Sequence, residues 1–301
     1  MYEKSEFDSR ALIQLAEKTG PDLLYVSGWS DPDCLRVASA FKRENKPVVC
    51  AFDNQWRGTI RQRVASILSP WLIHTRFSHA WVPGSRQVEF ARKLGFPANR
   101  IHTGMYSADT LIFQNSFEET RLLKTASYPR RFLCVARLVE SKGIPDLLQA
   151  YKKYQNVTEN PWKLRIAGSG NLSESVRRAA GVEYMEFVQP GDLAELSRDS
   201  GALILPSRFE PWGVVLHEFS SAGLPLIAST ACGAAVELIA PGENGFLHRP
   251  GDPEDLLLQM KKISALDNNT LLYMSGRSRE ISSKYSPDIW ADTLVSIAEK
   301  N

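Results

Sequence analysis

The sequence has few of the residues and patterns that mark secreted, membrane-spanning or metal-binding proteins. Only four of its 301 residues are cysteine, and no two of them form a C-x-x-C pair or a zinc spacing, so neither a disulfide framework nor a metal site is indicated. The five histidines show no metal spacing either. No apolar run approaches the roughly 18 residues that a membrane span needs. The start, MYEKSEFDSR, contains no apolar signal region, so we expect a cytoplasmic protein.

The sequence also lacks a large excess of positive or negative charge. The formal net charge is +2, which is too small to favour nucleic acid as a partner. Hydrophobic residues make up 43% of the chain and charged residues 23%, which is the composition of an ordinary soluble globular protein. A length of 301 residues suggests two domains of ordinary size.

The sequence does contain a regular alternation of short apolar runs with amphipathic segments. One series of apolar runs lies at 23–26, 47–52 and 80–82, and a second series begins at Arg131. Strands that alternate with helices predict an α/β fold with parallel sheets and right-handed crossovers. The two series meet near 115–128, which is the best candidate for a linker.

The stretch 202–225, ALILPSRFEPWGVVLHEFSSAGLP, combines a strand, a loop and a helix. The run ALIL predicts a buried parallel strand, and Gly213 opens a helix that runs to about Ala222. The first backbone N–H groups of such a helix have no intrahelical acceptors, so they favour an anion. Glu210 in the loop and Glu218 in the helix, separated by seven residues, frame this site. Taken alone, a loop glutamate is usually only a solvated charge.

Two cations form a second constellation. Arg137 and Lys142 follow the apolar run 132–136 within ARLVESKG. Arginine can fork onto phosphate oxygens while lysine acts as a point charge, so the pair suits a diphosphate that gains negative charge as it departs. Either cation alone is more simply a solvated loop charge. Gly168, in IAGSG, permits a tight turn after the next strand.

Together these motifs resemble the retaining glycosyltransferases of family 4, which have the GT-B fold. The resemblance covers about residues 132–255 and includes FVQPGDLAEL and CGAAVELIAPGENGFL. In the family the two glutamates contact the donor sugar and the nucleotide ribose, and the arginine and lysine bind the donor diphosphate. The resemblance therefore implies that Glu210 is the catalytic residue, orienting the donor sugar. The donor-binding residues that it implies are Arg137, Lys142, Gly168, Val188, Gly213, Val214, Val215 and Glu218.

The resemblance also implies a GT-B-like architecture, in which two Rossmann-type domains with parallel sheets face each other across a cleft. An acceptor-side domain is expected over residues 1–120 and a donor-binding domain over 121–285. A final helix over 286–301 is expected to cross back to the first domain.

The first half of the chain matches the family poorly. The chain starts partway into the usual first domain, so we expect that domain to be shortened. Many relatives have a histidine at the end of the strand that corresponds to 47–52, and none stands here. Asp53, Asn54 and Arg57 follow this run, and since ligands collect at the carboxyl ends of parallel strands, we expect them on the acceptor side.

The implied function is transfer of a hexose-like sugar from a nucleotide diphosphate sugar to a hydroxyl of a glycan or lipid-linked acceptor, with retention of configuration, as in polysaccharide biosynthesis. The family needs no metal, so we expect neither a metal nor another cofactor. The alternative is a non-catalytic nucleotide-sugar-binding partner with a reduced first domain, which would carry the same donor motifs. An epimerase or phosphorylase that shares the fold is a third possibility, although no motif for the pyridoxal phosphate lysine of a glycogen-type phosphorylase is present.

The segment 57–73 has two interpretations. Its helical period places Ile60, Val64, Ile67, Leu68, Trp71 and Leu72 in one apolar stripe, flanked by Arg57, Arg61 and Arg63. Such a helix can pack its stripe on the sheet. A basic amphipathic helix can instead lie on an anionic membrane surface, with Trp71 and the three arginines as contacts. His217, beside Glu218, could likewise line the donor site or belong to the core.

Overall fold

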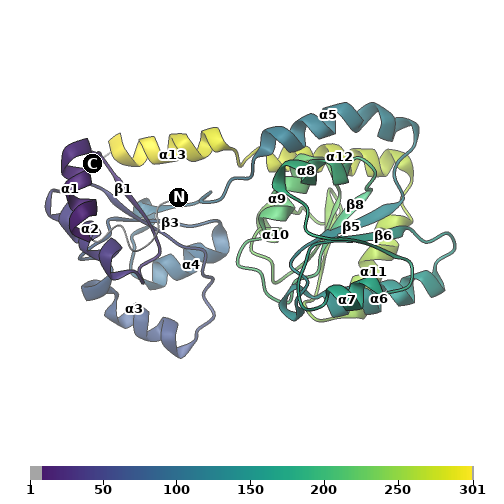
Figure 1. Ribbon diagram of the computed structural model, residues 1–301, viewed down its shortest axis with the longest axis horizontal. Helices are drawn as coiled ribbons and strands as arrows, with labels where there is room; N and C mark the ends of the chain where they lie inside the picture. The colour runs from purple at the N-terminus through teal and green to yellow at the C-terminus, as the bar shows by residue number, and fades with distance from the viewer. Residues whose placement is uncertain (1–8, 300–301) are drawn as a thin grey trace. The chain divides into compact units, whose positions relative to one another are not determined.

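The computed structural model describes residues 9–299, and within them the chain divides into two compact units (Figure 1). The first unit is built from two separate pieces of the chain, residues 9–106 and 288–299. The second unit is one continuous piece, Ser107–Pro287. Each unit has its own parallel sheet and its own apolar core, so the predicted α/β class with two parallel sheets is confirmed.

The first unit is a four-stranded parallel sheet in the order β1-β2-β3-β4. Its apolar runs become strands because their side chains can be buried against helices, and every residue of β2 is buried. The strands are β1 (Leu24–Ser27), β2 (Val48–Ala51), β3 (His79–Trp81) and β4 (Ile101–His102). Helix α1 (Ser9–Thr19) precedes β1, and helices α2 (Pro32–Arg43), α3 (Ile60–Leu72) and α4 (Ser85–Lys93) follow β1, β2 and β3.

The last helix, α13 (Pro287–Glu299), packs on the first unit. The indole of Trp290 stacks on that of Trp81, with ring centroids 4.9 Å apart, and its Nε1–H donates to the carbonyl of Met105 at 3.0 Å. Ile297 is buried in the same small cluster. A helix from the end of the sequence therefore completes the core of the unit that begins it.

The second unit is a six-stranded parallel sheet in the order β10-β9-β8-β5-β6-β7. Because β5 lies between β6 and β8, the loops after these three strands are neighbours at one edge of the sheet. The strands are β5 (Arg131–Val135), β6 (Lys163–Ala167), β7 (Val182–Met185), β8 (Ala202–Leu205), β9 (Leu226–Ser229) and β10 (Gly245–His248).

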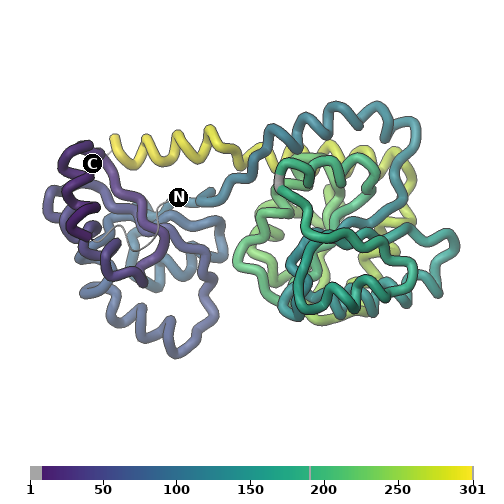
Figure 2. The backbone as a smooth tube through the Cα atoms, viewed as in Figure 1, coloured from purple at the N-terminus to yellow at the C-terminus, as the bar shows by residue number. Residues whose placement is uncertain are grey.

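Helices cover both faces of this second sheet. Helices α6 and α11 pack together on one face, and α5, α9 and α12 pack together on the other (Figure 1; Figure 2 follows the same path of the chain). The α-helices are α5 (Thr110–Ala126), α6 (Ile144–Val157), α7 (Ser173–Arg177), α8 (Pro190–Leu193), α9 (Val214–Ser221), α10 (Ala235–Leu238), α11 (Pro253–Ser264) and α12 (Asn268–Ser282). The short 3-10 helices of the second unit are η2 (Glu140–Lys142) and η3 (Ala194–Ser197), and η1 (Ala98–Arg100) belongs to the first unit.

The prediction of a linker near 115–128 was wrong, because most of that segment belongs to helix α5. The buried side chains of α5 are Thr110, Phe113, Ser116, Thr120 and Lys124, which recur at helical spacing but are mostly polar. A search for apolar periodicity therefore misses this helix. The change from the first unit to the second occurs at Tyr106, so residue 120, where the first domain was expected to end, lies inside α5.

None of the helices within residues 9–299 is both long enough and apolar enough to span a bilayer.

Candidate functional site

The carboxyl ends of β5, β6 and β8 carry three loops that hold most of the predicted donor residues. The loop after β5 contains Arg137 and Lys142, the loop after β6 contains Gly168, and the loop after β8 contains Glu210. In open parallel sheets this edge is where ligands bind. The order of the strands therefore brings together motifs that lie up to 73 residues apart in the sequence, from Arg137 to Glu210.

Gly168 allows the loop after β6 to lie directly against the loop after β5. Its φ is +143°, and a Cβ atom at this position would lie 1.9 Å from the carbonyl oxygen of Ala136. A Cβ on Gly170 would lie 2.3 Å from the carbonyl oxygen of Leu138. The backbone N–H of Leu138 donates to the carbonyl of Ser169 at 2.9 Å. These glycines thus serve close backbone packing that any side chain would prevent.

Lys142 and Glu210 meet at this edge as an ion pair between Nζ and Oε2. Both side chains are largely shielded, with 21% of the lysine side chain and 13% of the glutamate side chain exposed. Gly143, with a φ of +68°, makes the approach possible, since a Cβ there would lie 2.0 Å from the carbonyl oxygen of Pro206. The structure therefore joins the predicted diphosphate-binding lysine to the predicted catalytic glutamate.

Arg208 fastens the loop that carries Glu210. Its guanidinium donates two hydrogen bonds, from Nε and Nη2, to the two carboxylate oxygens of Asp146, each at 2.8 Å. The Asp146 carboxylate is buried near the start of α6, and the backbone N–H of Arg208 donates to the carbonyl of Ser141 at 2.9 Å. Sequence analysis missed this pair, since no local pattern connects two charges 62 residues apart.

The N-terminus of α9 lies beside Glu210. Gly213 is the N-cap with a φ of +102°, and a Cβ there would lie 3.2 Å from Cγ of Glu210. No side chain caps this end through a hydrogen bond. The first N–H groups of the helix, those of Val214 and Val215 included, have no intrahelical acceptors and favour a negative charge. The predicted strand, loop and helix of 202–225 are thus present.

Glu218 lies one turn into α9 and is mostly buried. Burial raises its pKa from 4.5 to about 7, because the ionised carboxylate loses hydration in these surroundings. Near neutral pH the side chain is therefore divided between its acid and carboxylate forms. A buried carboxyl group with a strongly raised pKa is a candidate functional group.

His217 does not line this site; it belongs to the core. Its side chain is 1% exposed, Nδ1 accepts a hydrogen bond from the N–H of Ala108 at 3.1 Å, and Nε2 donates to the carbonyl of Tyr285 at 3.1 Å. Burial lowers the pKa of the imidazole, which keeps it neutral and suits one accepting and one donating nitrogen. The histidine therefore holds the first and last segments of the second unit against α9.

The remaining predicted residues lie at other places. Arg137 is exposed in the loop after β5, and Val188 is half-buried in the segment that follows β7. Asp53, Asn54 and Arg57 all lie in the first unit, beyond the carboxyl end of β2, where the Asp53 carboxylate accepts a hydrogen bond from the Tyr106 hydroxyl at 3.2 Å. Asp53 thus follows its strand as the sequence predicted.

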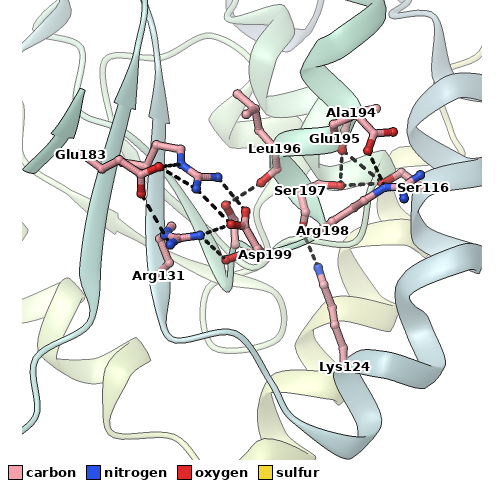
Figure 3. Close-up of polar contacts among 12 residues, drawn as sticks. Ser116, Lys124, Arg131, Glu183, Ala194, Glu195, Leu196, Ser197, Arg198 and Asp199 are labelled. Carbon is pink, nitrogen blue, oxygen red and sulfur yellow. Dashed lines mark hydrogen bonds and ion pairs between the residues drawn. The ribbon is translucent and has the colours of Figure 1, made fainter. Parts of the chain in front are cut away.

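A second polar cluster lies near the amino ends of the strands of the second unit (Figure 3). Arg165 donates to both carboxylate oxygens of Asp199, at 2.6 and 3.0 Å, and to Glu183 at 2.9 Å. Arg131 pairs with the same two acids. Nearby, the buried Lys124 donates to the carbonyl of Ser197 at 2.9 Å, and burial lowers its pKa to about 8. The arginines and acids pair with one another at the edge opposite to the donor loops, so we interpret the cluster as structural.

No metal centre is apparent in the part of the chain that the structure describes, where no three or more histidine, cysteine, aspartate or glutamate side chains gather in a way that could hold an ion. Asp31 and Asp33, which have the spacing of a metal motif, lie at the start of α2, and the Asp31 carboxylate caps this helix by accepting from the N–H groups of Asp33 and Cys34.

Comparison with known proteins identifies the family. The model of the family described as glycosyl transferases group 1 matches residues 117–280, more than half of the chain. The chain belongs to this family. All the predicted donor residues of the group 1 protein lie within the matched segment, from Arg137 to Glu218.

Curated relatives agree with this assignment. The group 1 protein is 27% identical over 175 residues to an uncharacterized glycosyltransferase of Methanocaldococcus jannaschii, covering 56% of this chain and 44% of the relative. It is 29% identical over 167 residues to the glycogen synthase of Mycobacterium tuberculosis, covering 52% and 40%. It is 28% identical over 173 residues to the amylovoran biosynthesis glycosyltransferase AmsD of Erwinia amylovora, covering 54% and 48%. The chain thus spans less than half the length of these relatives.

Solved structures agree with the group 1 protein over nearly its whole length. A glycosyltransferase from Rickettsia africae superimposes with a TM-score of 0.76 at 14% identity, covering all of this chain and 83% of the other. HepE of Anabaena, in complex with UDP and glucose, superimposes with a TM-score of 0.73 at 17% identity, covering 97% and 81%. The predicted GT-B-like class with two parallel-sheet α/β domains is thereby confirmed.

Proposed function

We propose that this protein is a retaining glycosyltransferase of family 4 that transfers a hexose-like sugar from a nucleoside diphosphate sugar to an acceptor hydroxyl. The proposal is carried by the meeting of Lys142, Glu210 and the start of α9 at the carboxyl ends of β5 and β8, inside the segment that matches the group 1 model. HepE, which shares the fold, has been solved with UDP and with UDP-glucose, which supports this class of donor.

The donor diphosphate would bind Arg137, Lys142 and the first N–H groups of α9. The exposed guanidinium of Arg137 can fork onto phosphate oxygens, and the shielded ammonium of Lys142 supplies a point charge. These groups would stabilise the charge that develops on the departing diphosphate, which is the part that a metal ion has in other enzymes. In this proposal the reaction needs no divalent cation.

Glu210 would orient the donor sugar instead of attacking it. Its ion pair with Lys142 supports this role, because Lys142 is the proposed phosphate-binding cation and the contact between the two side chains would align the sugar with its leaving group. In a front-face displacement the bond between the anomeric carbon and the phosphate oxygen breaks while the acceptor oxygen bonds to the same face. The proton of the acceptor hydroxyl passes to the departing phosphate oxygen, so configuration is retained.

The nucleoside would lie between Glu218 and the loops after β6 and β7. The Glu218 side chain would accept hydrogen bonds from the ribose hydroxyls, and these contacts favour the ionised form of a carboxyl whose pKa burial raises to about 7. Gly168 and the backbone near Val188 would adjoin the base. Donor binding would thus recruit residues from three strand ends of one sheet.

The rest of the proposal concerns the acceptor side. A glycan or lipid-linked acceptor would contact Asp53, Asn54 and Arg57, which follow β2. The matched relative AmsD takes part in the biosynthesis of amylovoran, and by analogy we propose a role in polysaccharide biosynthesis.

The decisive experiment measures binding of nucleoside diphosphates by calorimetry and release of nucleoside diphosphate from a panel of nucleotide sugars with and without acceptors. Replacing both Arg137 and Lys142 by alanine should weaken binding by roughly 2–5 kcal/mol, because charge-assisted hydrogen bonds to the diphosphate are lost. Lys152→Ala, an exposed lysine on α6, is the matched control and should bind as the wild type does. If the double variant and the wild type bind nucleoside diphosphates with equal affinity, the proposed donor site is wrong. Binding without turnover on any donor would instead favour a non-catalytic partner.

A further inference from the structure

Helix α3 is oriented with its apolar face outward. Ile60, Val64, Ile67, Leu68, Trp71 and Leu72 are all exposed, with 83% of Ile60 and 67% of Trp71 accessible. At 3.6 residues per turn these six side chains form one continuous stripe, called here the α3 face. Ser69 is the buried residue of the helix. The interpretation in which this stripe packs on the sheet is therefore wrong.

Small and polar side chains explain this orientation. Ala65, a small residue at the edge of the α3 face, packs against the core of the first unit. Gln62, on the side of α3 opposite to the α3 face, donates from Nε2 to the carbonyl of Gln55 at 2.7 Å and accepts from the N–H of Arg57 at 2.8 Å. Thr59 caps the helix by accepting from the N–H of Gln62. The polar contacts hold the helix in an orientation that hydrophobic burial alone would reverse.

The charge around the α3 face is of one sign. From Asn54 to Val88 the sequence contains five arginines and no aspartate or glutamate. On an ideal helix Arg63 borders the α3 face on one side, and Arg61 projects near its other side, between the directions of Leu68 and Leu72. Both side chains belong to exposed residues. An apolar stripe with cations near both sides matches the interface of an anionic bilayer, in which acyl chains lie beneath phosphate groups.

A cationic cavity lies beyond the C-terminal end of α3. It has a volume of about 460 Å³, and Lys42, Lys46, Arg100 and His74 are among its lining residues. Lys46 pairs with Glu44 at 3.1 Å, whereas Arg100 and Lys42 add to the effect of burial in lowering the pKa of the neighbouring His79 to about 4. The positive charge of this part of the first unit therefore extends past the helix itself.

We propose that the α3 face is a docking surface for an anionic lipid bilayer. The apolar side chains would enter the interfacial region, the Trp71 indole would lie at the level of the headgroups, and the bordering arginines would contact lipid phosphates. A second copy of the chain fits the same face less well, because a two-fold contact would bring the arginines of both copies together. The proposal concerns the first unit and does not rest on the donor site in the second.

The test is co-sedimentation of the full chain with vesicles of phosphatidylcholine alone and of phosphatidylcholine with phosphatidylglycerol. We expect binding to the anionic vesicles at least tenfold tighter than to the neutral ones, and a loss of affinity as salt increases. Two double variants, Ile67→Ser with Trp71→Ser and Arg61→Glu with Arg63→Glu, should each weaken this binding at least tenfold. Circular dichroism and thermal unfolding establish that both remain folded.

Matched controls alter equally exposed residues of the second unit. Leu122→Ser with Leu123→Ser removes two exposed apolar side chains from α5, and Lys152→Glu with Lys261→Glu reverses two exposed charges. Both controls should keep wild-type binding to vesicles. Equal binding by the wild type and the α3 variants, or no binding to anionic vesicles at low salt, overturns the proposal. If the wild type does not bind vesicles but forms a dimer, and the double variant Ile67→Ser with Trp71→Ser is monomeric, the α3 face is instead a contact with a second copy. Nucleotide binding measured without vesicles separates these outcomes from those for the donor site.

Discussion

Glu210 and Glu218 stand on either side of the start of α9, in different surroundings. Glu210 is paired with Lys142, whereas burial dominates the environment of Glu218. The contact proposed for Glu218, with the ribose, exists equally in the ground state and the transition state. The contact proposed for Glu210 orients the reacting sugar and matters most in the transition state.

Glu218→Gln should therefore raise KM for the donor more than it lowers kcat, and Glu210→Gln should mainly lower kcat. Steady-state kinetics of both variants checks this, with circular dichroism to establish that each is folded. The assignment of 202–225 as the donor site fails if both variants keep the wild-type kcat and KM.

The raised pKa of Glu218 makes a separate prediction about stability. Its pKa is about 7 in the folded protein and 4.5 as the ordinary value, so the folded state disfavours the ionised form. Below pH 4.5 the group is protonated in both states and costs nothing. As pH rises through 7 the cost increases to about 3 kcal/mol, at 1.36 kcal/mol per unit of pKa difference. Glu218→Gln should therefore raise the free energy of unfolding at pH 8.5 by up to about 3 kcal/mol and change it little at pH 4.5.

Urea unfolding at the two pH values measures this difference. Glu186→Gln, an exposed residue beyond β7, controls for the general effect of removing a carboxylate. A Glu218→Gln variant whose gain in stability is the same at both pH values would contradict the interpretation of Glu218 as a buried carboxyl. Stability gained together with donor affinity lost is the expected signature of a binding group.

Among single residues, the sequence could predict those that belong to compact motifs. Lys142 and Glu210 were predicted through their local patterns, and the structure brings the two together. Arg208, Asp146 and His217 could not be assigned, because their partners are distant in sequence and a charged or aromatic side chain looks the same locally whether paired or solvated.

Among the elements, the loop from β8 to α9 depends on one ion pair. Asp146 is buried, and Arg208 meets it with two hydrogen bonds of 2.8 Å, which hold the loop that carries Glu210. Asp146→Asn should lower stability by about 1–3 kcal/mol, because a charge-assisted fork is lost at a partly exposed arginine. It should also lower kcat/KM roughly tenfold, since the loop loses its position.

Denaturant unfolding and donor kinetics measure the two effects. Glu140→Gln is the control, because Glu140 is exposed and reaches Arg208 only at 3.4 Å. If Asp146→Asn keeps both the stability and the kcat/KM of the wild type, this pair does not position the loop.

The elements that periodicity predicted well are those in which apolar burial decides the structure. The runs that became β2, β5 and β8 are examples, since every residue of β2 and β8 and the three central residues of β5 are buried. Periodicity misjudged α5, whose inner face is mostly polar, and it could not orient α3, whose inner face is small and polar. In both helices specific hydrogen bonds and small side chains outweigh the usual apolar rule.

For the whole molecule, we predict that turnover needs no divalent metal. In the proposed donor site, Arg137, Lys142 and the start of α9 would supply positive potential for the diphosphate. Activity should therefore persist in excess chelator, within a factor of about two. Activity that chelator abolishes and magnesium or manganese restores would contradict the proposed electrostatics. The control variant Lys152→Ala, which alters an exposed lysine on α6, should respond to chelator as the wild type does.

The architecture of the whole chain was predictable because alternating strands and helices allow few other arrangements. The course of the chain between the units was less so. No local signal marks Tyr106 as the end of the first piece. The return of α13 to the first unit depends on contacts of Trp290 with Trp81 and Met105, which precede it by more than 180 residues.

Because the first unit consists of two separate pieces of the chain, it cannot complete its core until the end of synthesis. During synthesis the whole second unit, Ser107–Pro287, leaves the ribosome before α13 does. Until then Val49, Ala51, Trp81 and Met105 lack the apolar cover that Trp290, Leu294 and Ile297 later supply. The apolar patch of the nascent first unit therefore remains exposed while the second unit is synthesised and folds. At about 5–20 residues per second that delay lasts on the order of ten seconds or more, during which the patch is open to chaperones.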